Sequence, residues 1–204
     1  MSEDPAIYTI DTSQLTDGVV VARPWVPDDA PALYEAARES IETVGRWLPW
    51  LDSMYAREHT DVWIRETQEL WRARSEFRFG VFSARDGTCL GAVALNHINS
   101  THRLANLGYW LRTSATGRGY ATRAARLAAR FGLADAQLGR IEILTDVANL
   151  PSQRVAIALG AHFDAVLRDR LFHRGEWKPA HLYSLVRSDL PQLEAAIGRR
   201  DGST

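Results

Sequence analysis

The amino-acid sequence predicts a mixed α/β domain of the α+β kind. Two helical segments follow a first strand, three strands then form a meander in the middle of the chain, and a glycine-rich loop with helices and strands completes it. The expected sheet is mostly antiparallel, with about seven strands and about four flanking helices.

Length and composition describe an ordinary globular chain. It has 204 residues, of which 46% are hydrophobic and 24% charged, and its formal net charge is −1. This balance argues against disorder and against a basic surface that would hold nucleic acid or an anionic membrane. A single cysteine, Cys89, and the absence of an apolar signal-like run in Met1–Asp11 lead us to expect a cytoplasmic protein.

The first third of the chain predicts one strand and two helices. Val19–Arg23 is apolar and β-branched, so it is expected to form the first strand. Asp28-Asp29 supply acceptors and negative charge for a helix N-terminus, and we expect that helix to end near Gly45. A second helix is expected from about Val62 to Trp71. The apolar face of the first helix is Leu33, Ala37, Ile41 and Val44.

The middle of the chain changes to strand patterning. Phe77–Ser83 is followed by the turn signal Asp86-Gly87 and by a return strand, Cys89–Ile98. A polar turn then leads into Leu104–Leu111. These three segments are expected to pair as an antiparallel meander.

The remaining elements alternate between helices and strands. An alanine-rich helix follows the glycines and reaches Phe131, and a short strand follows at Ile141–Thr145. The next helix is expected to start at Pro151 and to end before Gly160. The last two strands are predicted at His162–Leu167 and His181–Val186.

The segment Gly117–Thr122 is the one with the clearest chemical meaning. Glycines allow a tight turn, and the free N–H groups at a helix start, with the helix dipole behind them, bind phosphate. A turn that merely begins a helix remains the alternative. The pattern lacks the lysine of a nucleotide P-loop, and Thr122 stands where the dinucleotide fingerprint has its third glycine. Both of those phosphate-binding readings are therefore disfavoured.

Taken together, these segments resemble the GNAT superfamily of acetyltransferases, and most closely its RimJ/RimL-like branch. The resemblance covers about Val19–Asp189 within one expected GNAT domain over residues 1–204. The segments that carry it are Arg23-Pro24-Trp25 with Asp28-Asp29-Ala30, Trp47–Trp50, Gly108–Leu111, Gly117–Thr122, and Asn149–Ser152 with Val155 and Leu159-Gly160-Ala161.

The resemblance implies a sheet that is splayed between its fourth and fifth strands to admit the pantetheine of acetyl-CoA. It also implies transfer of the acetyl group to a primary amine by direct attack in a ternary complex. Asn149 and Ser152 are then expected beside the cofactor, with Ser152 near the sulfur and with helix capping as a shared or alternative role. No metal ligand is expected. The implied cofactor-binding residues are Trp110, Leu111, Arg112, Gly117, Arg118, Gly119, Tyr120, Ala121, Thr122, Asn149 and Ser152.

The sequence departs from the branch at positions that concern the base and the acceptor. Ser114 replaces a glutamine or arginine before the first loop glycine, and Asn106 replaces a carboxylate in the fourth strand. His97 is the candidate base, with His102, Glu39 or no base at all as alternatives. Together with Ser152 and Asn149, His97 completes the predicted catalytic group.

The acceptor side of the site is expected to involve Trp47, Trp50 and Tyr55. The alternative is that these side chains pack the first two helices together. The acceptor itself is either a protein N-terminal amine or a small-molecule amine. A GNAT-like module that binds acyl-CoA without turnover is the competing function, and a nucleotide-binding protein of another fold is less favoured. The late strands are exposed enough that a homodimer is possible, whereas nucleic-acid and membrane partners are not expected.

Overall fold

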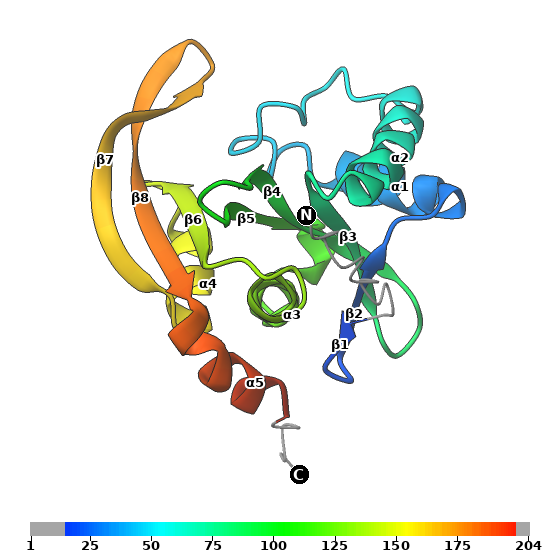
Figure 1. The fold of residues 1–204 in the computed structure, drawn as a ribbon. Helices are drawn as coiled ribbons and strands as arrows, with labels where there is room; N and C mark the ends of the chain where they lie inside the picture. The colour runs from blue at the N-terminus through cyan, green and yellow to red at the C-terminus, as the bar shows by residue number, and fades with distance from the viewer. Residues whose placement is uncertain (1–14, 199–204) are drawn as a thin grey trace, which may run out of the picture.

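The computed structural model describes residues 15–198, so the segment Met1–Asp11 lies outside the described residues. Within this range, eight strands form one sheet in the order β1-β2-β3-β4-β5-β6-β8-β7, and five α-helices accompany it (Figure 1). All neighbouring strands pair antiparallel except β5 and β6, which are parallel. The predicted fold class is confirmed, with one strand and one helix more than expected.

The boundaries of the elements follow the predicted order. The strands are β1 (Leu15–Thr16), β2 (Val20–Pro24), β3 (Phe77–Ser83), β4 (Cys89–Asn99), β5 (Leu104–Leu111), β6 (Arg140–Asp146), β7 (His162–His173) and β8 (Glu176–Val186). The helices are α1 (Ala30–Glu39), α2 (Arg57–Arg72), α3 (Tyr120–Ala134), α4 (Leu150–Leu159) and α5 (Leu190–Gly198). No helix in the described part is long and apolar enough to cross a membrane.

The first helix is shorter than its sequence pattern predicts. It ends at Glu39, and the chain continues in turns through residue 47. A Cβ on Gly45 would lie 2.2 Å from the carbonyl oxygen of Leu51 and 2.3 Å from that of Ile41, so only glycine fits this close approach. Ile41 and Val44 keep their apolar role by packing beside the small core cluster around Leu51. The helical spacing of apolar residues therefore continues past the end of α1, because Ile41 and Val44 pack against this cluster from the turns that follow.

The last two strands are longer than predicted and form a curved hairpin that extends from the sheet (Figure 1). Its turn is Arg174-Gly175, with φ values of 51° and 82°, which suits a tight hairpin. Phe172 and Trp177 pair across the strands near this turn and are largely exposed. Near the turn, both faces of the hairpin are largely exposed, so this part of the sequence lacks the alternation of apolar and polar residues that predicts a strand. The homodimer through these strands stays a prediction.

The sheet separates two sets of helices. On β4, Val93 and Leu95 pack into the main core with α3, whereas Ala92 faces a second cluster that includes residues of α1 and α2. On β5, Leu107 belongs to the α3 side and Trp110 to the α1 side. Side chains that alternate along β5 thus reach opposite compartments of the molecule.

The parallel pair β5 and β6 separates after a short contact. Pairing covers only Leu104↔Arg140, Ala105↔Ile141 and Asn106↔Glu142, while β6 continues beside β8 as far as Asp146. Among the strands of the described range, the stretch of β5 from Leu107 to Leu111 therefore pairs with β4 alone. The fourth and fifth predicted strands correspond to β5 and β6, so the predicted splay between them is confirmed. The glycine loop follows β5 at the open end of this gap.

Candidate functional site

The glycine loop presents an unbroken row of free backbone donors. Gly117 and Gly119 both have φ of 75°, and Gly119 is the residue before the first turn of α3. Among the described residues, no backbone N–H of residues 117–122 donates to a protein acceptor, and the next, Arg123, bonds to Gly119. A Cβ on either glycine would meet nothing within 4 Å. The loop is open to an external ligand.

The loop has the properties of an anion-binding site. Its six N–H groups lie at the positive end of the α3 dipole, where phosphate is stabilised. Arg118 is exposed and has no ion pair with a described residue, so its guanidinium is available to a ligand. Tyr120, Ala121 and Thr122 provide three of the donors from the first turn of α3. Residues 117–122 thus form one continuous loop and helix start, and their role in holding a cofactor stays a prediction.

The edge of β5 along the gap offers a second set of unpaired groups. The Arg112 N–H donates to the carbonyl oxygen of Leu90 in β4 at 2.8 Å. The backbone N–H and C=O groups of successive residues in a strand point to alternate sides. The backbone groups of Trp110 therefore also face β4, whereas those of Leu107, Tyr109 and Leu111 face the gap. The resemblance assigns Trp110, Leu111 and Arg112 to the cofactor, but the backbone groups of Trp110 and Arg112 face β4, so of these three only Leu111 turns its backbone groups toward the gap.

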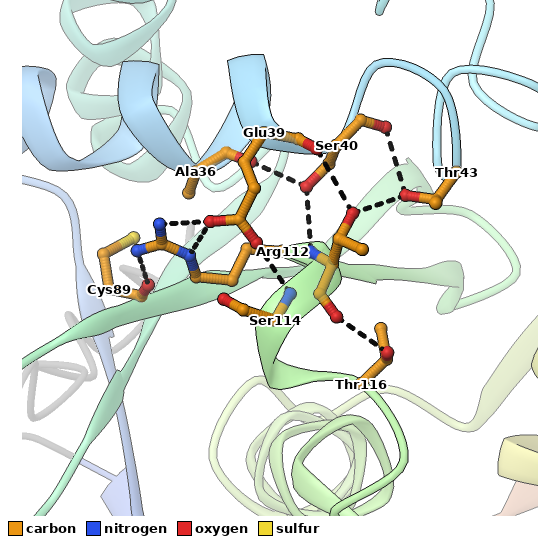
Figure 2. Close-up of polar contacts among 9 residues, drawn as sticks. Ala36, Glu39, Ser40, Thr43, Cys89, Arg112, Ser114 and Thr116 are labelled. Atoms are coloured by element: carbon orange, nitrogen blue, oxygen red, sulfur yellow. Dashed lines mark hydrogen bonds and ion pairs between the residues drawn. The ribbon is translucent and has the colours of Figure 1, made fainter.

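The side chain of Arg112 is occupied by Glu39, the last residue of α1 (Figure 2). Arg112 donates to Glu39 Oε2 from both Nε, at 2.8 Å, and Nη2. The hydrogen bonds from Arg112, helped by the Ser114 N–H, lower the pKa of Glu39 from 4.5 to about 2. A carboxylate with so low a pKa is a poor proton acceptor near neutral pH, so this geometry disfavours Glu39 as a base.

Asn149 and Ser152 lie at the start of α4, beside the gap. The Asn149 side chain accepts a hydrogen bond from the Ser152 N–H at 3.2 Å, so the capping role is present. The Tyr109 hydroxyl donates to the Ser152 carbonyl oxygen at 2.9 Å and lies 3.2 Å from Ser152 Oγ. Burial raises the pKa of Tyr109 to about 12, so the phenol keeps its proton.

Sequence reasoning missed Tyr109. Its place in a strand gives it the same signal as a core tyrosine, and its partner Ser152 is 43 positions away in the chain. Only the return of the chain through β6 brings the two together.

The predicted acceptor residues divide into two groups. Trp50 contacts Tyr55 and Trp110 with ring centroids 5.6 and 5.9 Å apart, and 47% of Trp50 is exposed. Tyr55 is buried, and its hydroxyl bonds to Thr60, so packing accounts for its position. Trp47 has no ring contact with this group among the described residues, and instead lies beneath the guanidinium of Arg46.

Two asparagines mark the closed end of the gap on the α1 side. Asn106 Nδ2 donates to Asn96 Oδ1 at 2.8 Å, and the buried Asn106 Oδ1 has no partner among the described residues. A Cβ built on Gly108 would have the amide nitrogens of these two side chains as its nearest described neighbours, at 3.8 and 3.9 Å, apart from the residues next to it in the chain. Polar groups and an uncovered stretch of strand therefore lie side by side on this face.

His97 follows Asn96 at an irregularity in β4. It is exposed, has φ of 51°, and falls where the β4–β5 register shifts between Asn96 and Asn99. Its neighbour Asn96 is bonded to Asn106, the last residue of β5 that pairs with β6. His102 lies farther out, in the exposed turn after β4, where its N–H bonds to Asn99.

The buried thiol of Cys89 stands apart from this chemistry. Burial raises the pKa of Cys89 to about 11, so little thiolate forms near neutral pH. Within residues 15–198, no group of three or more histidine, cysteine or acidic side chains is arranged to hold a metal ion.

Comparison with known proteins agrees with this geometry. Residues 20–162 match the model of the acetyltransferase (GNAT) domain family. The chain is 30% identical over 139 residues to the probable N-acetyltransferase YjcK of Bacillus subtilis, covering 68% of this chain and 77% of YjcK. It is 32% identical over 133 residues to the spermidine N(1)-acetyltransferase of Escherichia coli K12, covering 64% of this chain and 68% of that protein.

A solved structure shares the fold. RimJ of Mycobacterium smegmatis, in complex with CoA-disulfide, superposes with a TM-score of 0.78 at 24% identity, over 92% of this chain and 94% of RimJ. The resemblance to the RimJ/RimL-like branch is thereby confirmed at the level of the fold. With the family model matching well over half of the sequence, the chain belongs to the GNAT acetyltransferase domain family.

Proposed function

We propose that this protein transfers an acetyl group from acetyl-CoA to a primary amine by direct attack in a ternary complex. The observation that carries the proposal is the row of six free N–H groups at residues 117–122, placed at the open end of the gap between β5 and β6. It supports a pyrophosphate at the loop and a pantetheine chain along the free edge of β5. Family membership supports the same cofactor.

Each part of the cofactor then has candidate partners in this chain. Residues 117–122 and Arg118 would hold the pyrophosphate, and the backbone groups of Leu107, Tyr109 and Leu111 would pair with the pantetheine amides. Asn149 would orient the first turn of α4 so that the Ser152 hydroxyl lies near the sulfur. The site is thus divided between an anion-binding end and an acyl-transfer end.

The reaction needs a neutral amine, a donor for the oxyanion and a proton for the leaving thiolate. The amine nitrogen attacks the thioester carbon, a backbone N–H of the β5 edge stabilises the oxyanion, and the carbon–sulfur bond then breaks. Ser152 Oγ would supply a proton to the departing sulfur. Direct attack is favoured over an acetyl-cysteine intermediate because Cys89 is buried and remains a thiol.

For the proton of the amine we assign His97 as the base, acting directly or through water. The assignment is supported by its position one residue beyond Asn96, at the closed end of the gap. Asn106 itself has no basic group. An acceptor with a low amine pKa, such as an N-terminal α-amine, needs less help from a base than a lysine-like amine does.

The acceptor would approach from the α1 side, over Gly108, with Trp50 and Trp110 beside it. Both a protein N-terminus and a small amine fit this description, and Trp47 is retained as an outer contact. A cytoplasmic location and a homodimer through the late strands belong to the same proposal.

The first test is a thermal-shift titration with acetyl-CoA, performed on the parent protein and on Gly119→Trp. A ligand that binds only the folded state raises the melting temperature. We expect stabilisation of the parent and none of the folded variant, because the indole would occupy the open space at Gly119. No stabilisation of the parent at millimolar acetyl-CoA would refute the proposed cofactor site.

A second candidate function is an acyl-CoA-binding module without turnover, favoured by the absence of a carboxylate at Asn106. Release of free thiol from acetyl-CoA, measured across a panel of peptide and small amines, separates the two. Binding without thiol release from any amine would favour the module.

A further inference from the structure

The carboxylate of Glu39 lies beside the chain segment that leads into the glycine loop (Figure 2). Its Oε1 accepts a hydrogen bond from the Ser114 N–H at 2.6 Å, and its Oε2 accepts two from Arg112. Glu39 thus bonds both to the residue directly after β5 and to one three positions before Gly117. It does so from the end of α1, on the opposite face of the sheet from α3.

The neighbouring residues strengthen the same junction. The Thr113 N–H donates to Ser40 Oγ at 3.1 Å, and the Thr113 hydroxyl donates to the Glu39 carbonyl oxygen at 3.3 Å. Ser40 is fully buried, and its hydroxyl in turn donates to Ala36 in α1 at 2.7 Å. Three consecutive residues, 112–114, are therefore bonded to the C-terminal end of α1.

The guanidinium of Arg112 extends this junction to β4. Its Nη1 donates to the Cys89 carbonyl oxygen at 3.4 Å, and its backbone N–H bonds to Leu90. Arg112 also neutralises the charge of Glu39, which would otherwise repel an anion at the loop. The segment before the loop is held on two sides without leaving an unpaired carboxylate.

This arrangement matters because the donors themselves have no internal support. Within residues 15–198, the N–H groups of residues 117–122 donate to no protein acceptor, and two of these residues are glycines in the left-handed region. Binding an anion to such a loop costs less free energy when the loop is already ordered. Before the loop, the chain is held by the junction at residues 112–114 and by Ala115, which is buried in the main core and donates its N–H to the Arg112 carbonyl oxygen.

We infer that Glu39 is a positioning residue for the phosphate-binding loop, acting through Arg112 and Ser114 without touching the cofactor. The inference rests on the proposed function. If the Glu39–Arg112 pair were merely structural, its loss would lower the stability of the whole fold and reduce the rate with every acetyl donor equally. A positioning role affects only donors that carry the pyrophosphate.

The experiment compares acetyl-CoA with S-acetylpantetheine, which has the same thioester but no phosphate. Initial rates of thiol release are measured with both donors and with any amine that the parent accepts, and acetyl-CoA binding is measured by calorimetry. The variant is Glu39→Gln, which is nearly isosteric. The matched control is Glu35→Gln, one turn earlier in α1 and exposed, with no hydrogen bond to a described residue.

For Glu39→Gln we expect the dissociation constant and the KM of acetyl-CoA to rise about fivefold, the upper range for a partly exposed ion pair. We expect kcat to change by less than about twofold, and kcat/KM for S-acetylpantetheine to stay at the parent value. Arg112→Lys keeps the charge but loses the forked contact, and should show the same pattern. Glu35→Gln should match the parent with both donors.

Three results would overturn the inference. If the parent is active and Glu39→Gln binds acetyl-CoA as tightly as the parent or more tightly, the positioning role of Glu39 is refuted and the proposed function stands. An equal loss with both donors shows that Glu39 acts through the whole fold. Failure of the parent itself to bind acetyl-CoA removes the proposed function and this inference together.

Discussion

The hydroxyl of Tyr109 donates a hydrogen bond to the carbonyl oxygen of Ser152 at 2.9 Å, and so joins β5 to the first turn of α4. These two elements stand on opposite sides of the gap, because β6 leaves β5 after Asn106 and leads into α4. The contact thus links the two sides of the gap beyond the last paired residues of β5 and β6. It also places the Ser152 hydroxyl 3.2 Å from the phenol.

We expect Tyr109→Phe to lower the free energy of unfolding by about 1 kcal/mol, because a half-buried carbonyl loses its donor. The kcat should also fall, since Ser152 loses the contact that orients it. Urea unfolding and steady-state kinetics measure the two effects. Trp71→Phe provides the comparison, because it removes an indole donor to the Arg78 carbonyl oxygen and part of a ring packed against Phe77, all of it outside the gap. It should lose at least as much stability as Tyr109→Phe and yet keep more of the parent kcat.

Gly119→Ala tests the glycine loop with a smaller change than tryptophan. The backbone at Gly119 has φ of 75°, and a non-glycine residue there costs about 1 kcal/mol. The melting temperature should therefore fall by about 2–4 °C, and acetyl-CoA should bind more weakly because the loop relaxes away from the ligand. Gly87→Ala has a similar φ of 72° and equally open surroundings, in the β3–β4 turn. It should lose the same stability while its affinity for acetyl-CoA stays that of the parent.

The pair Arg23–Asp29 predicts a stability effect away from the loop. Arg23 contacts both carboxylate oxygens of Asp29 at 2.7 Å, and the Asp29 side chain is only 10% exposed. Removing the carboxylate leaves a half-buried guanidinium without its partner and the Val26 N–H without its acceptor. Asp29→Ala should lower the free energy of unfolding by about 2–3 kcal/mol, as measured by urea denaturation. The adjacent and exposed Asp28→Ala should change it by less than about 0.5 kcal/mol.

Glu39 predicts a pH dependence of stability with a defined direction. Hydrogen bonds from Arg112 lower the pKa of Glu39 from 4.5 to about 2 in the folded state. A lowered carboxylate pKa means that its contribution is fully present above about pH 4.5 and is lost as the pH falls toward 2. The difference in unfolding free energy between the parent and Glu39→Gln should be constant from pH 7 to about 5 and should shrink below that. A difference that grows on acidification would contradict this assignment.

His97→Asn removes the proposed base while keeping a residue that tolerates the positive φ. We expect kcat/KM to fall by about tenfold or more at neutral pH, and the acidic limb of the pH–rate profile to move to the pKa of the amine. His102→Asn, in the neighbouring exposed turn, should keep the kcat/KM and the pH–rate profile of the parent. An unchanged profile in His97→Asn would mean that the amine loses its proton without help from this side chain.

The central elements were predictable because local and tertiary preferences agree there. β3, β4 and β5 alternate in polarity or are continuously apolar, and the turn signal Asp86-Gly87 lies between the first two. The glycine loop was equally visible, since glycine is the residue that adopts a positive φ at the lowest cost. The same holds for the cap at Asn149, whose side chain and helix start are adjacent in the chain.

The elements that were missed have weak local signals. β1 has only two residues, and α5 follows a polar turn close to the end of the described range. The outer part of the β7–β8 hairpin, residues 168–179, is mostly exposed, so it has neither an alternating pattern nor a buried run. In each case the preference for structure comes from packing against distant parts of the chain.

The site shows the same division. The sequence by itself determined the order of elements, the loop of donors at residues 117–122 and the helix start at Asn149, because each depends on the chemistry of adjacent residues. Only the tertiary structure decided that Tyr109 meets Ser152, that Glu39 takes up Arg112, and that Leu107, Tyr109 and Leu111 face the gap. The physical reason is that these relationships depend on strand register and on the separation of β5 from β6, which residues far apart in the chain fix only when they pack.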